Sequence, residues 1–430
     1  MSRRKVYWPT VAAAMVLAGA IAVGANAAGT FVEPGVQVLH EFDGSAHSAS
    51  FGWAVSELGD VDRDGVRDAI VGEPFTDGGS TYVYSGRTGK LLYRFDGTSG
   101  DFNGFSMADA GDTNGDGAHD ILVGSPGNDA GHVDLYSGKT GELLHRFVGA
   151  QAGDAFGWSV SSAGDVNRDG RTDVLIGASQ AFNGAGPGYA DIYSGGTYAL
   201  LRTLTGNTAG DQFGSGAGWT RDVNRDGVPD QIVGARDAGV GGRGQVYVYS
   251  GKTGVGLFTI DASPHGDSLG SFFVAGVGDV NRDGTPDIYA GDYYDSTNGS
   301  DPSVPTASGR AAVYSGRDGR ELLSWVGSDA DEGLGPGRSA GDVNHDGHPD
   351  LIIGSYTSNS GAPGAGKVQI FSGADGSVLR TITSTTTGEN FGFDAVSLGD
   401  TNRDGAPDEL VAAATGDHVY IIAGTPPRGH

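Results

Sequence analysis

The sequence predicts an all-β fold, a seven-bladed β-propeller built from four-stranded blades. First, an acidic nonapeptide such as DVNRDGVPD at 222–230 occurs seven times, at intervals of 52 to 63 residues. Such a period is typical of a repeat architecture and not of independent domains. Second, each unit contains four short apolar or alternating segments and no helical periodicity of useful length. Third, the chain starts and stops inside a unit, which is how a propeller ring is closed.

The third unit shows the expected elements in order. The segment 156–165 (FGWSVSSAGD) contains the inner strand, and the acidic loop follows it. Apolar and alternating runs at 174–179, 189–197 and 200–206 then predict the second, third and fourth strands, with glycine-rich turns between them. A β-solenoid is the alternative, although solenoid coils are usually shorter than this period.

The two ends of the chain predict how the ring closes. Residues 36–42 align with the fourth strands of later units, whereas the chain ends after a second and a third strand at 409–424. The segment at 36–42 is therefore expected to complete the last blade, so that no sheet edge stays open. The propeller should span residues 31–425, with a short tail at 426–430.

Residues 1–27 are expected to be a secretory signal peptide. Basic residues at 3–5 precede an apolar stretch over 11–24, and an Ala-Asn-Ala cleavage signal ends at Ala27. An uncleaved anchor is the alternative, but the stretch is short for a bilayer span of about 20 residues. The sequence therefore predicts a secreted protein (extracellular, periplasmic or on the cell surface) with no membrane span after cleavage.

Charge and cysteine content narrow the class of partner. The formal net charge of −26 argues against nucleic acid, whose phosphates require basic patches. The chain has no cysteine, so a secreted fold must be stabilised by something other than disulfides.

The acidic loops have the oxygen pattern of a calcium site. Asp stands at positions 1, 5 and 9, Asp or Asn at position 3 and Gly at position 6, while position 7 varies. A hard cation takes six or more oxygen ligands, here side chains at 1, 3, 5 and 9 and the backbone carbonyl at 7. The predicted ligands of up to seven Ca²⁺ ions are Asp60, Asp62, Asp64, Val66, Asp68; Asp112, Asn114, Asp116, Ala118, Asp120; Asp165, Asn167, Asp169, Arg171, Asp173; Asp222, Asn224, Asp226, Val228, Asp230; Asp279, Asn281, Asp283, Thr285, Asp287; Asp342, Asn344, Asp346, His348, Asp350; and Asp400, Asn402, Asp404, Ala406, Asp408.

The loops differ from an EF-hand and from a simple tight turn. An EF-hand needs a bidentate Glu at position 12, where all seven loops have an apolar residue such as Val233. A turn in which Asp and Gly merely favour tight backbone geometry is the second alternative, and seven copies with Asp at position 9 argue against it. Seven divalent ions would also offset about half of the net charge.

The pattern resembles the FG-GAP repeats of the integrin α-subunit propeller and its bacterial relatives. It departs from the family with Leu269-Gly270 and Leu334-Gly335 in place of Phe-Gly and with the order inverted to Gly104-Phe105 in the second unit. The resemblance implies calcium-stabilised binding of extracellular proteins or glycans, often in adhesion, with calcium loops on one face of the disc and ligands on the other. The matching residues are Phe51-Gly52, Phe156-Gly157, Phe213-Gly214, Phe391-Gly392, Gly72-Glu73-Pro74, Gly124-Ser125-Pro126 and Gly177-Ala178.

No residue is assigned a catalytic role. Ser268 lies in a GDSLG sequence that matches a nucleophile elbow, but other units have GDAFG and GDQFG at the same place. The glycine-rich stretch at 239–244 precedes a strand, whereas a dinucleotide site needs a helix. An extracellular hydrolase or lyase acting on polysaccharide or phosphoester is the alternative function.

The least repetitive segment is the candidate ligand site. Residues 292–309 join the second and third strands of the fifth unit, and binding residues concentrate on long loops of rigid scaffolds. Asp292, Tyr293, Tyr294 and Asp295 are the candidate contacts. The tryptophans near the inner strands, Trp53, Trp158 and Trp219, are expected to pack in the core or between blades and not to bind ligand.

Overall fold

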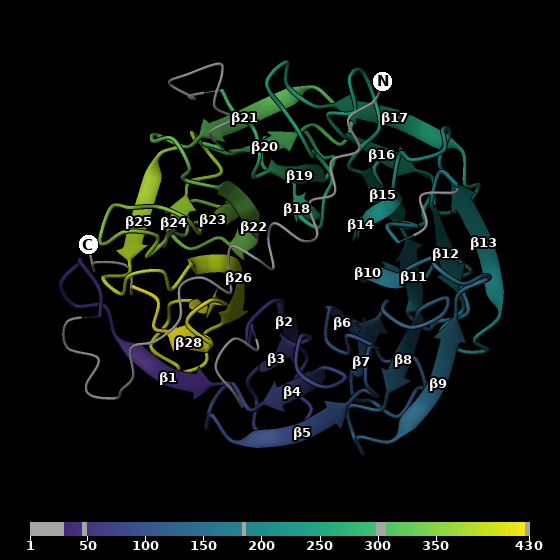
Figure 1. Cartoon of the computed structure of the whole chain (residues 1–430), viewed down its shortest axis with the longest axis horizontal. Coiled ribbons are helices and arrows are strands. Elements are labelled where there is room, and N and C mark those ends of the chain that lie inside the picture. Colours follow the sequence, from purple (N-terminus) through teal and green to yellow (C-terminus); the bar gives the residue numbers. More distant parts are fainter. Residues whose placement is uncertain (1–29, 45–49, 183–185, 298–306, 426–430) are drawn as a thin grey trace.

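The computed structural model describes residues 30–44, 50–182, 186–297 and 307–425. Seven antiparallel sheets of four strands each stand around a central axis and form a closed disc (Figure 1). The predicted all-β, seven-bladed propeller is confirmed. The expected signal peptide at 1–27 and the tail at 426–430 lie outside the described residues.

Each of the first six blades runs in chain order from an inner to an outer strand, and the seventh takes its outer strand from the start of the chain. The strands are, blade by blade, β2 (Val55–Leu58), β3 (Asp68–Glu73), β4 (Ser80–Tyr84), β5 (Leu91–Asp96); β6 (Ser106–Gly111), β7 (Asp120–Ser125), β8 (His132–Tyr136), β9 (Leu143–Val148); β10 (Phe156–Gly164), β11 (Asp173–Ala178), β12 (Tyr189–Tyr193), β13 (Leu200–Thr205); β14 (Phe213–Thr220), β15 (Asp230–Ala235), β16 (Gln245–Tyr249), β17 (Gly256–Asp261); β18 (Val274–Gly278), β19 (Asp287–Asp292), β20 (Arg310–Tyr314), β21 (Glu321–Val326); β22 (Leu334–Gly341), β23 (Asp350–Ser355), β24 (Lys367–Phe371), β25 (Val378–Thr383); and β26 (Phe391–Gly399), β27 (Asp408–Ala413), β28 (His418–Ile422), β1 (Val38–Asp43).

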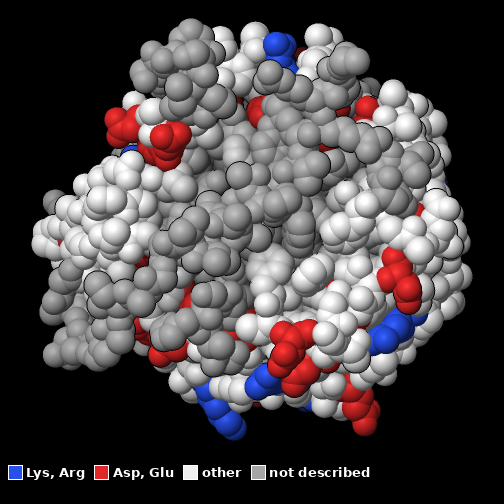
Figure 2. All heavy atoms as spheres, in the orientation of Figure 1, with Lys and Arg blue, Asp and Glu red and all other residues white. Residues whose placement is uncertain are grey.

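The hydrophobic core lies between neighbouring blades. Every residue of every second strand is buried, so these strands do not alternate between buried and exposed residues, and each begins with the Asp at loop position 9. One cluster, for example, joins Val55 and Val71 of the first blade to Leu410 and Val419 of the seventh. Charged side chains gather toward the rim of the described surface in Figure 2.

The ring closes as predicted. Strand β1 pairs antiparallel with β28, so that Phe42 lies opposite Val419 and Asp43 opposite His418. The Phe42 ring is buried and stacks on Tyr84 of the first blade, with ring centroids 4.2 Å apart. The two ends of the chain are therefore held in one sheet, and that sheet packs on the first blade.

Glycine is required where neighbouring blades come closest. At the fifth position of the second strand, an added Cβ would lie only 1.9 to 2.3 Å from a backbone carbonyl oxygen of the next blade, well inside van der Waals contact. That carbonyl belongs to the glycine that follows the Phe, Leu or Asn at the start of the inner strand. The seventh blade differs, because Ala412 faces Gly52 there. The other six pairs are Gly72–Gly104, Gly124–Gly157, Gly177–Gly214, Gly234–Gly270, Gly291–Gly335 and Gly354–Gly392.

In the second unit, Asn103 replaces the Phe of the Phe-Gly pair, whereas the sequence indicated that the order of the pair was inverted to Gly104-Phe105. Asn103 bridges Gly79, in the same way that Phe213 bridges Gly188 and Phe391 bridges Gly366. Asn103 therefore takes the Phe position, and its buried Oδ1 accepts a hydrogen bond from Thr81 Oγ1 at 2.9 Å. The interpretation of Gly104-Phe105 as an inverted pair was wrong, since Phe105 stands one position later, where other units have Trp, Ser, Pro or Phe.

Substituting Gly234 by alanine is expected to destabilise the propeller by about 2 kcal/mol or more, because overpacking against rigid backbone forces the two blades apart. Its Cβ would lie 1.9 Å from the Gly270 carbonyl oxygen. Gly256→Ala is the control, since the nearest atom to its Cβ is a Tyr249 ring carbon at an ordinary 3.8 Å. Urea titration of both variants measures the difference, and equal midpoints would contradict the packing argument.

Candidate functional site

The topology separates the loops onto two faces of the disc. Because neighbouring strands run antiparallel, loops joining strands one to two and three to four share one face. Loops joining strands two to three, and one blade to the next, share the other. All seven acidic loops join a first to a second strand, so they lie on one face, and the Phe-Gly ends of the inner strands lie on the opposite face.

Each acidic loop is folded around its own carboxylates. In the first loop Asp60 accepts hydrogen bonds from the amides of Asp64 (3.0 Å) and Gly65 (2.8 Å). The buried Asp68 accepts from Val61 N at 2.8 Å and from Gly86 N, in the turn between strands three and four, at 3.2 Å. The same pattern recurs around Asp230, Asp287 and Asp350. The position-9 carboxylate thus ties the loop to the neighbouring hairpin of its blade.

Each loop buries one carboxylate and leaves its other carboxylates at or near the surface. All seven position-9 carboxylates are fully buried. Burial raises the pKa of the Asp68 carboxyl to about 7, and it raises the pKa values of Asp173, Asp230 and Asp287 to about 6. In the first loop, ligand oxygens of Asp60, Asp62 and Asp68 lie within 4.8 Å of one another. This oxygen-only donor set fits a hard divalent cation such as Ca²⁺.

Side chains at loop positions 4 and 7 link neighbouring loops. Arg168 donates to the Asp226 carbonyl of the next blade at 2.9 Å, and Arg403 of the last blade donates to the Asp64 carbonyl of the first at 3.1 Å. At position 7, Arg171 Nη1 donates to the Thr113 carbonyl of the preceding blade at 3.0 Å. The variable positions, which the ligand pattern treats as free, therefore carry contacts between blades.

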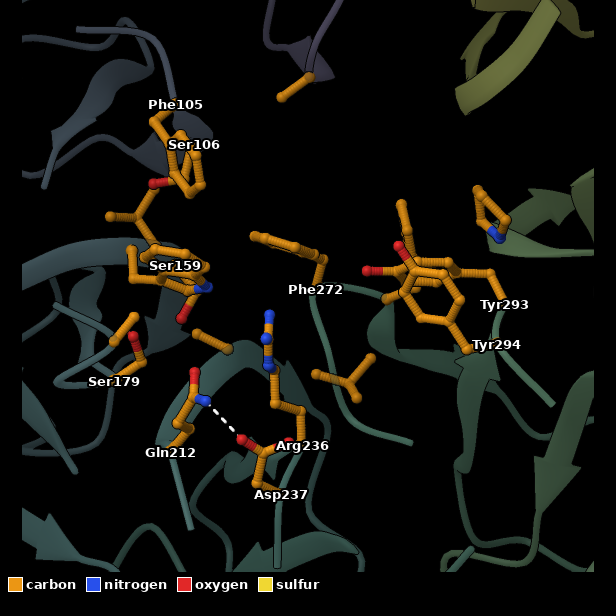
Figure 3. Close-up of a pocket in the computed structure, with 18 of the residues that line it drawn as sticks. Phe105, Ser106, Ser159, Ser179, Gln212, Arg236, Asp237, Phe272, Tyr293 and Tyr294 are labelled. Atoms are coloured by element: carbon orange, nitrogen blue, oxygen red, sulfur yellow. Dashed lines mark hydrogen bonds between the residues drawn. The ribbon is translucent and has the colours of Figure 1, made fainter. Parts of the chain in front are cut away.

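The opposite face holds a cavity of about 990 Å³ on the axis. The inner strands and the loops on that face form its wall. Many of the side chains that line it are aromatic (Figure 3). Four of these aromatic residues stand directly after the Phe-Gly or Asn-Gly pair of their unit, namely Trp53, Phe105, Trp158 and Phe393. The other large aromatic residues in the wall are Phe182, Phe272, Phe273, Tyr293, Tyr294 and Tyr356.

Trp53 and Trp158 pack between blades, as expected, but both also line the cavity. Trp158 is 3% exposed, and its ring lies on Phe272 with centroids 5.8 Å apart, yet it also lines the cavity. Trp53 contacts Phe105 and Phe393 and lines the cavity too. Trp219 is 37% exposed and is not a core residue. A usable signal was present in the sequence, because an aromatic residue follows the Phe-Gly or Asn-Gly pair in four units.

Of the four candidate ligand contacts at 292–295, the structure places two in the cavity wall and buries the other two beneath the loop. Tyr293 and Tyr294 line the cavity, with ring centroids 4.4 Å apart. Asp292 and Asp295 are buried at 2% and 0% exposure and hold loop backbone. Asp292 accepts hydrogen bonds from Asp267 N and Ser268 N at 3.0 and 3.1 Å. Residues 298–306 of this loop lie outside the described residues.

The GDSLG sequence has the surroundings of a turn. Ser268 is 6% exposed, and its Oγ has no hydrogen-bond partner among the described residues, so no base is positioned to activate it as a nucleophile. The stretch at 239–244 is the loop between β15 and β16, as expected. Within the described ranges no helix is long and apolar enough to cross a membrane.

The fold and loops define a class: a closed seven-bladed propeller in which every blade carries an acidic loop on one face. The FG-GAP repeat family model matches residues 156–193 and 339–371. Two of the seven units therefore match FG-GAP repeats.

Integrin α chains are similar to it. Chicken integrin alpha-8 is 28% identical over 62% of this chain and 25% of that relative. Chicken integrin alpha-V is 31% identical over 44% and 20%, and human integrin alpha-6 is 32% identical over 32% and 13%. The chain thus spans a quarter or less of the length of these relatives.

Proposed function

We propose that this protein is a secreted, calcium-binding propeller that acts as a protein- or glycan-binding module of the adhesion type. The observation that carries the proposal is the axial cavity, which lies on the face opposite the acidic loops. Aromatic side chains from different blades converge there. Concave, largely aromatic sites with a few polar groups are the usual form of a ligand site. The similarity to integrin α chains supports the same assignment.

Calcium has a structural role in the proposal. The loops lie on the face away from the cavity, and their buried carboxylates bind backbone of their own blade. A cation there would hold the first and second strands of each blade together without touching the ligand. Ligand binding should therefore depend on calcium only through folding.

A cavity variant tests the function. Phe182→Ala removes a wall side chain that is 41% exposed, so it is expected to weaken ligand binding about tenfold with little change in melting temperature. Leu200→Ala, on the outer strand β13 and 52% exposed, is the matched control. Binding is measured on arrays of extracellular proteins and glycans in calcium. Ligands retained equally by both variants would contradict cavity binding.

Tyr294→Ala is a second variant for that experiment. Replacing both tyrosines would be less clean, because Tyr293 packs against Phe273 and Tyr356 and its loss should also lower stability. The same protein sample is screened for turnover of polysaccharides and phosphoesters. Turnover would favour the hydrolase or lyase alternative over a binding module.

A further inference from the structure

Polar atoms without partners gather around the axial cavity. Buried polar side-chain atoms are nearly always hydrogen-bonded, so each exception needs an explanation, and a bound water or ligand is one. Several of the exceptions among the described residues belong to the cavity wall. They are Ser179 Oγ, Gln180 Oε1, Gln212 Oε1, Arg236 Nε and Arg338 Nε.

Neighbouring carboxylates fix which end of each glutamine is free. Gln212 Nε2 donates to Asp237 Oδ2 at 2.5 Å, and Gln180 Nε2 donates to Asp154 Oδ1 at 3.3 Å. Flipping either amide would place its oxygen against a carboxylate oxygen, so the orientation is set by chemistry. Both glutamines therefore present an acceptor without a donor.

The two arginines present donors of different kinds. Arg338 Nη2 is paired with Asp394 Oδ1 at 2.6 Å, which neutralises its charge and leaves Nε without a partner. Arg236 has no ion pair among the described residues, and its side chain points into the space between Phe272 and Gln212 (Figure 3). The wall of the cavity thus contains both donors and acceptors that lack partners among the described residues.

These requirements select the chemistry of the ligand. A carboxylate or phosphate can accept from the arginines but cannot donate to the glutamine oxygens, and an ammonium group can donate but cannot accept. A hydroxyl group does both. Aromatic wall residues such as Phe182, which is 41% exposed, supply apolar faces against which a ring can pack. We propose that the cavity binds a neutral, hydroxyl-rich sugar ring of a glycan, an assignment that rests on the proposed binding function.

Size and charge agree with a neutral glycan. A cavity of about 990 Å³ is at the upper end of the usual range for small-molecule sites, so it has room for more than one sugar ring. The net charge of −26 opposes the approach of a polyanionic polymer, at least within the screening length of physiological salt. A neutral chain pays no such electrostatic cost.

Tryptophan fluorescence tests the assignment, because Trp53 and Trp158 line the cavity. The full chain in calcium is titrated with neutral probes (cellotetraose, xylotetraose, mannotetraose and maltotetraose) and with charged probes (tetragalacturonate and tetraglucosamine). At least one neutral probe should give a saturable change, and the charged probes should bind more weakly or not at all. Tighter binding of a charged probe, or no response to any neutral probe, would overturn the assignment.

Two variants locate the binding. Arg236→Met and Gln212→Leu keep most of the side-chain volume but remove a donor or an acceptor, and each should weaken binding of the neutral probe about tenfold to a hundredfold. Arg317→Met is the control, since Arg317 is exposed in the hairpin between β20 and β21 on the acidic-loop face. Neutral-probe affinity unchanged in both cavity variants would also overturn the assignment.

Failure of the sugar assignment can be told apart from failure of the binding function. If a protein from the arrays binds the parent but not Phe182→Ala, while no neutral sugar binds, the cavity is a binding site for another class of ligand. If neither arrays nor titrations give a ligand that depends on the cavity, both proposals fall.

Discussion

Deletion of residues 31–44 is expected to leave a chain without a cooperative thermal unfolding transition. The deletion removes β1, the outer strand of the seventh blade, and exposes the edge of β28 to pairing with other chains. It also uncovers the core beside the first blade, where Phe42 is 7% exposed. Losing one buried phenylalanine ring costs about 3–5 kcal/mol. The loss of the whole strand should therefore exceed a typical net stability of about 5–15 kcal/mol.

A further contact of the segment adds to this expectation. Glu33 accepts hydrogen bonds from Thr383 N at 2.7 Å and Thr383 Oγ1 at 2.8 Å, so the start of the chain also binds the sixth blade. Circular dichroism melting of the deletion protein, with Phe42→Ala as an intermediate case, measures the effect. Val32→Ala trims a side chain that is 53% exposed and should melt like the parent. A deletion protein with the parent's melting temperature would show that closure by β1 is dispensable.

The ring could be predicted from the sequence because each blade repeats the same physical problem. In every blade the second strand is buried on both sides and the inner strand ends at an acidic loop. The same order of residue types therefore occurs seven times in the sequence. Even the closing strand was visible, because 36–42 resembles the other outer strands. One local error arose where Asn103 replaces Phe, since a hydrogen bond to Thr81 replaces the usual ring packing there.

The cavity could not be predicted in the same way. Trp53 and Phe393 lie more than 300 residues apart in the sequence, yet their rings meet near the axis with centroids 5.1 Å apart. Only closure of the ring brings these two residues into contact, and no local sequence pattern predicts that contact. Gln180 and Gln212 have a free oxygen only because Asp154 and Asp237 accept hydrogen bonds from their NH2 groups. These contacts join different loops or turns, so the sequence does not show them. Likewise, the burial of Asp292 beneath the loop follows from three-dimensional packing and not from its place beside two tyrosines.

Calcium is expected to raise the melting temperature of the protein strongly. For a dissociation constant of about 10⁻⁴ M, at the tighter end of extracellular modules, millimolar calcium stabilises each site by about 1.4 kcal/mol. Seven independent sites would then contribute about 10 kcal/mol, comparable with the whole stability of a domain. The physical source is relief of the charge on the buried position-9 carboxylates and their neighbours in each loop. Calorimetry in calcium and in EDTA at equal ionic strength measures the shift, with magnesium as a test of ion selectivity.

A single-loop variant connects that shift to the loops and not to general screening of negative charge. Asp222→Asn removes one charge and one candidate ligand oxygen, and it keeps an acceptor for only one of the amides of Asp226 and Gly227, which donate to different oxygens of Asp222. It should lose about 1.4 kcal/mol of the calcium-dependent stabilisation, beyond a loss of about 1 kcal/mol in EDTA from the missing hydrogen bond. Asp329→Asn removes the same charge from an exposed loop on the opposite face and should keep the full calcium effect. Equal melting of the parent in EDTA and in calcium would contradict the calcium sites, whereas equal losses in the two variants would assign the effect to overall charge.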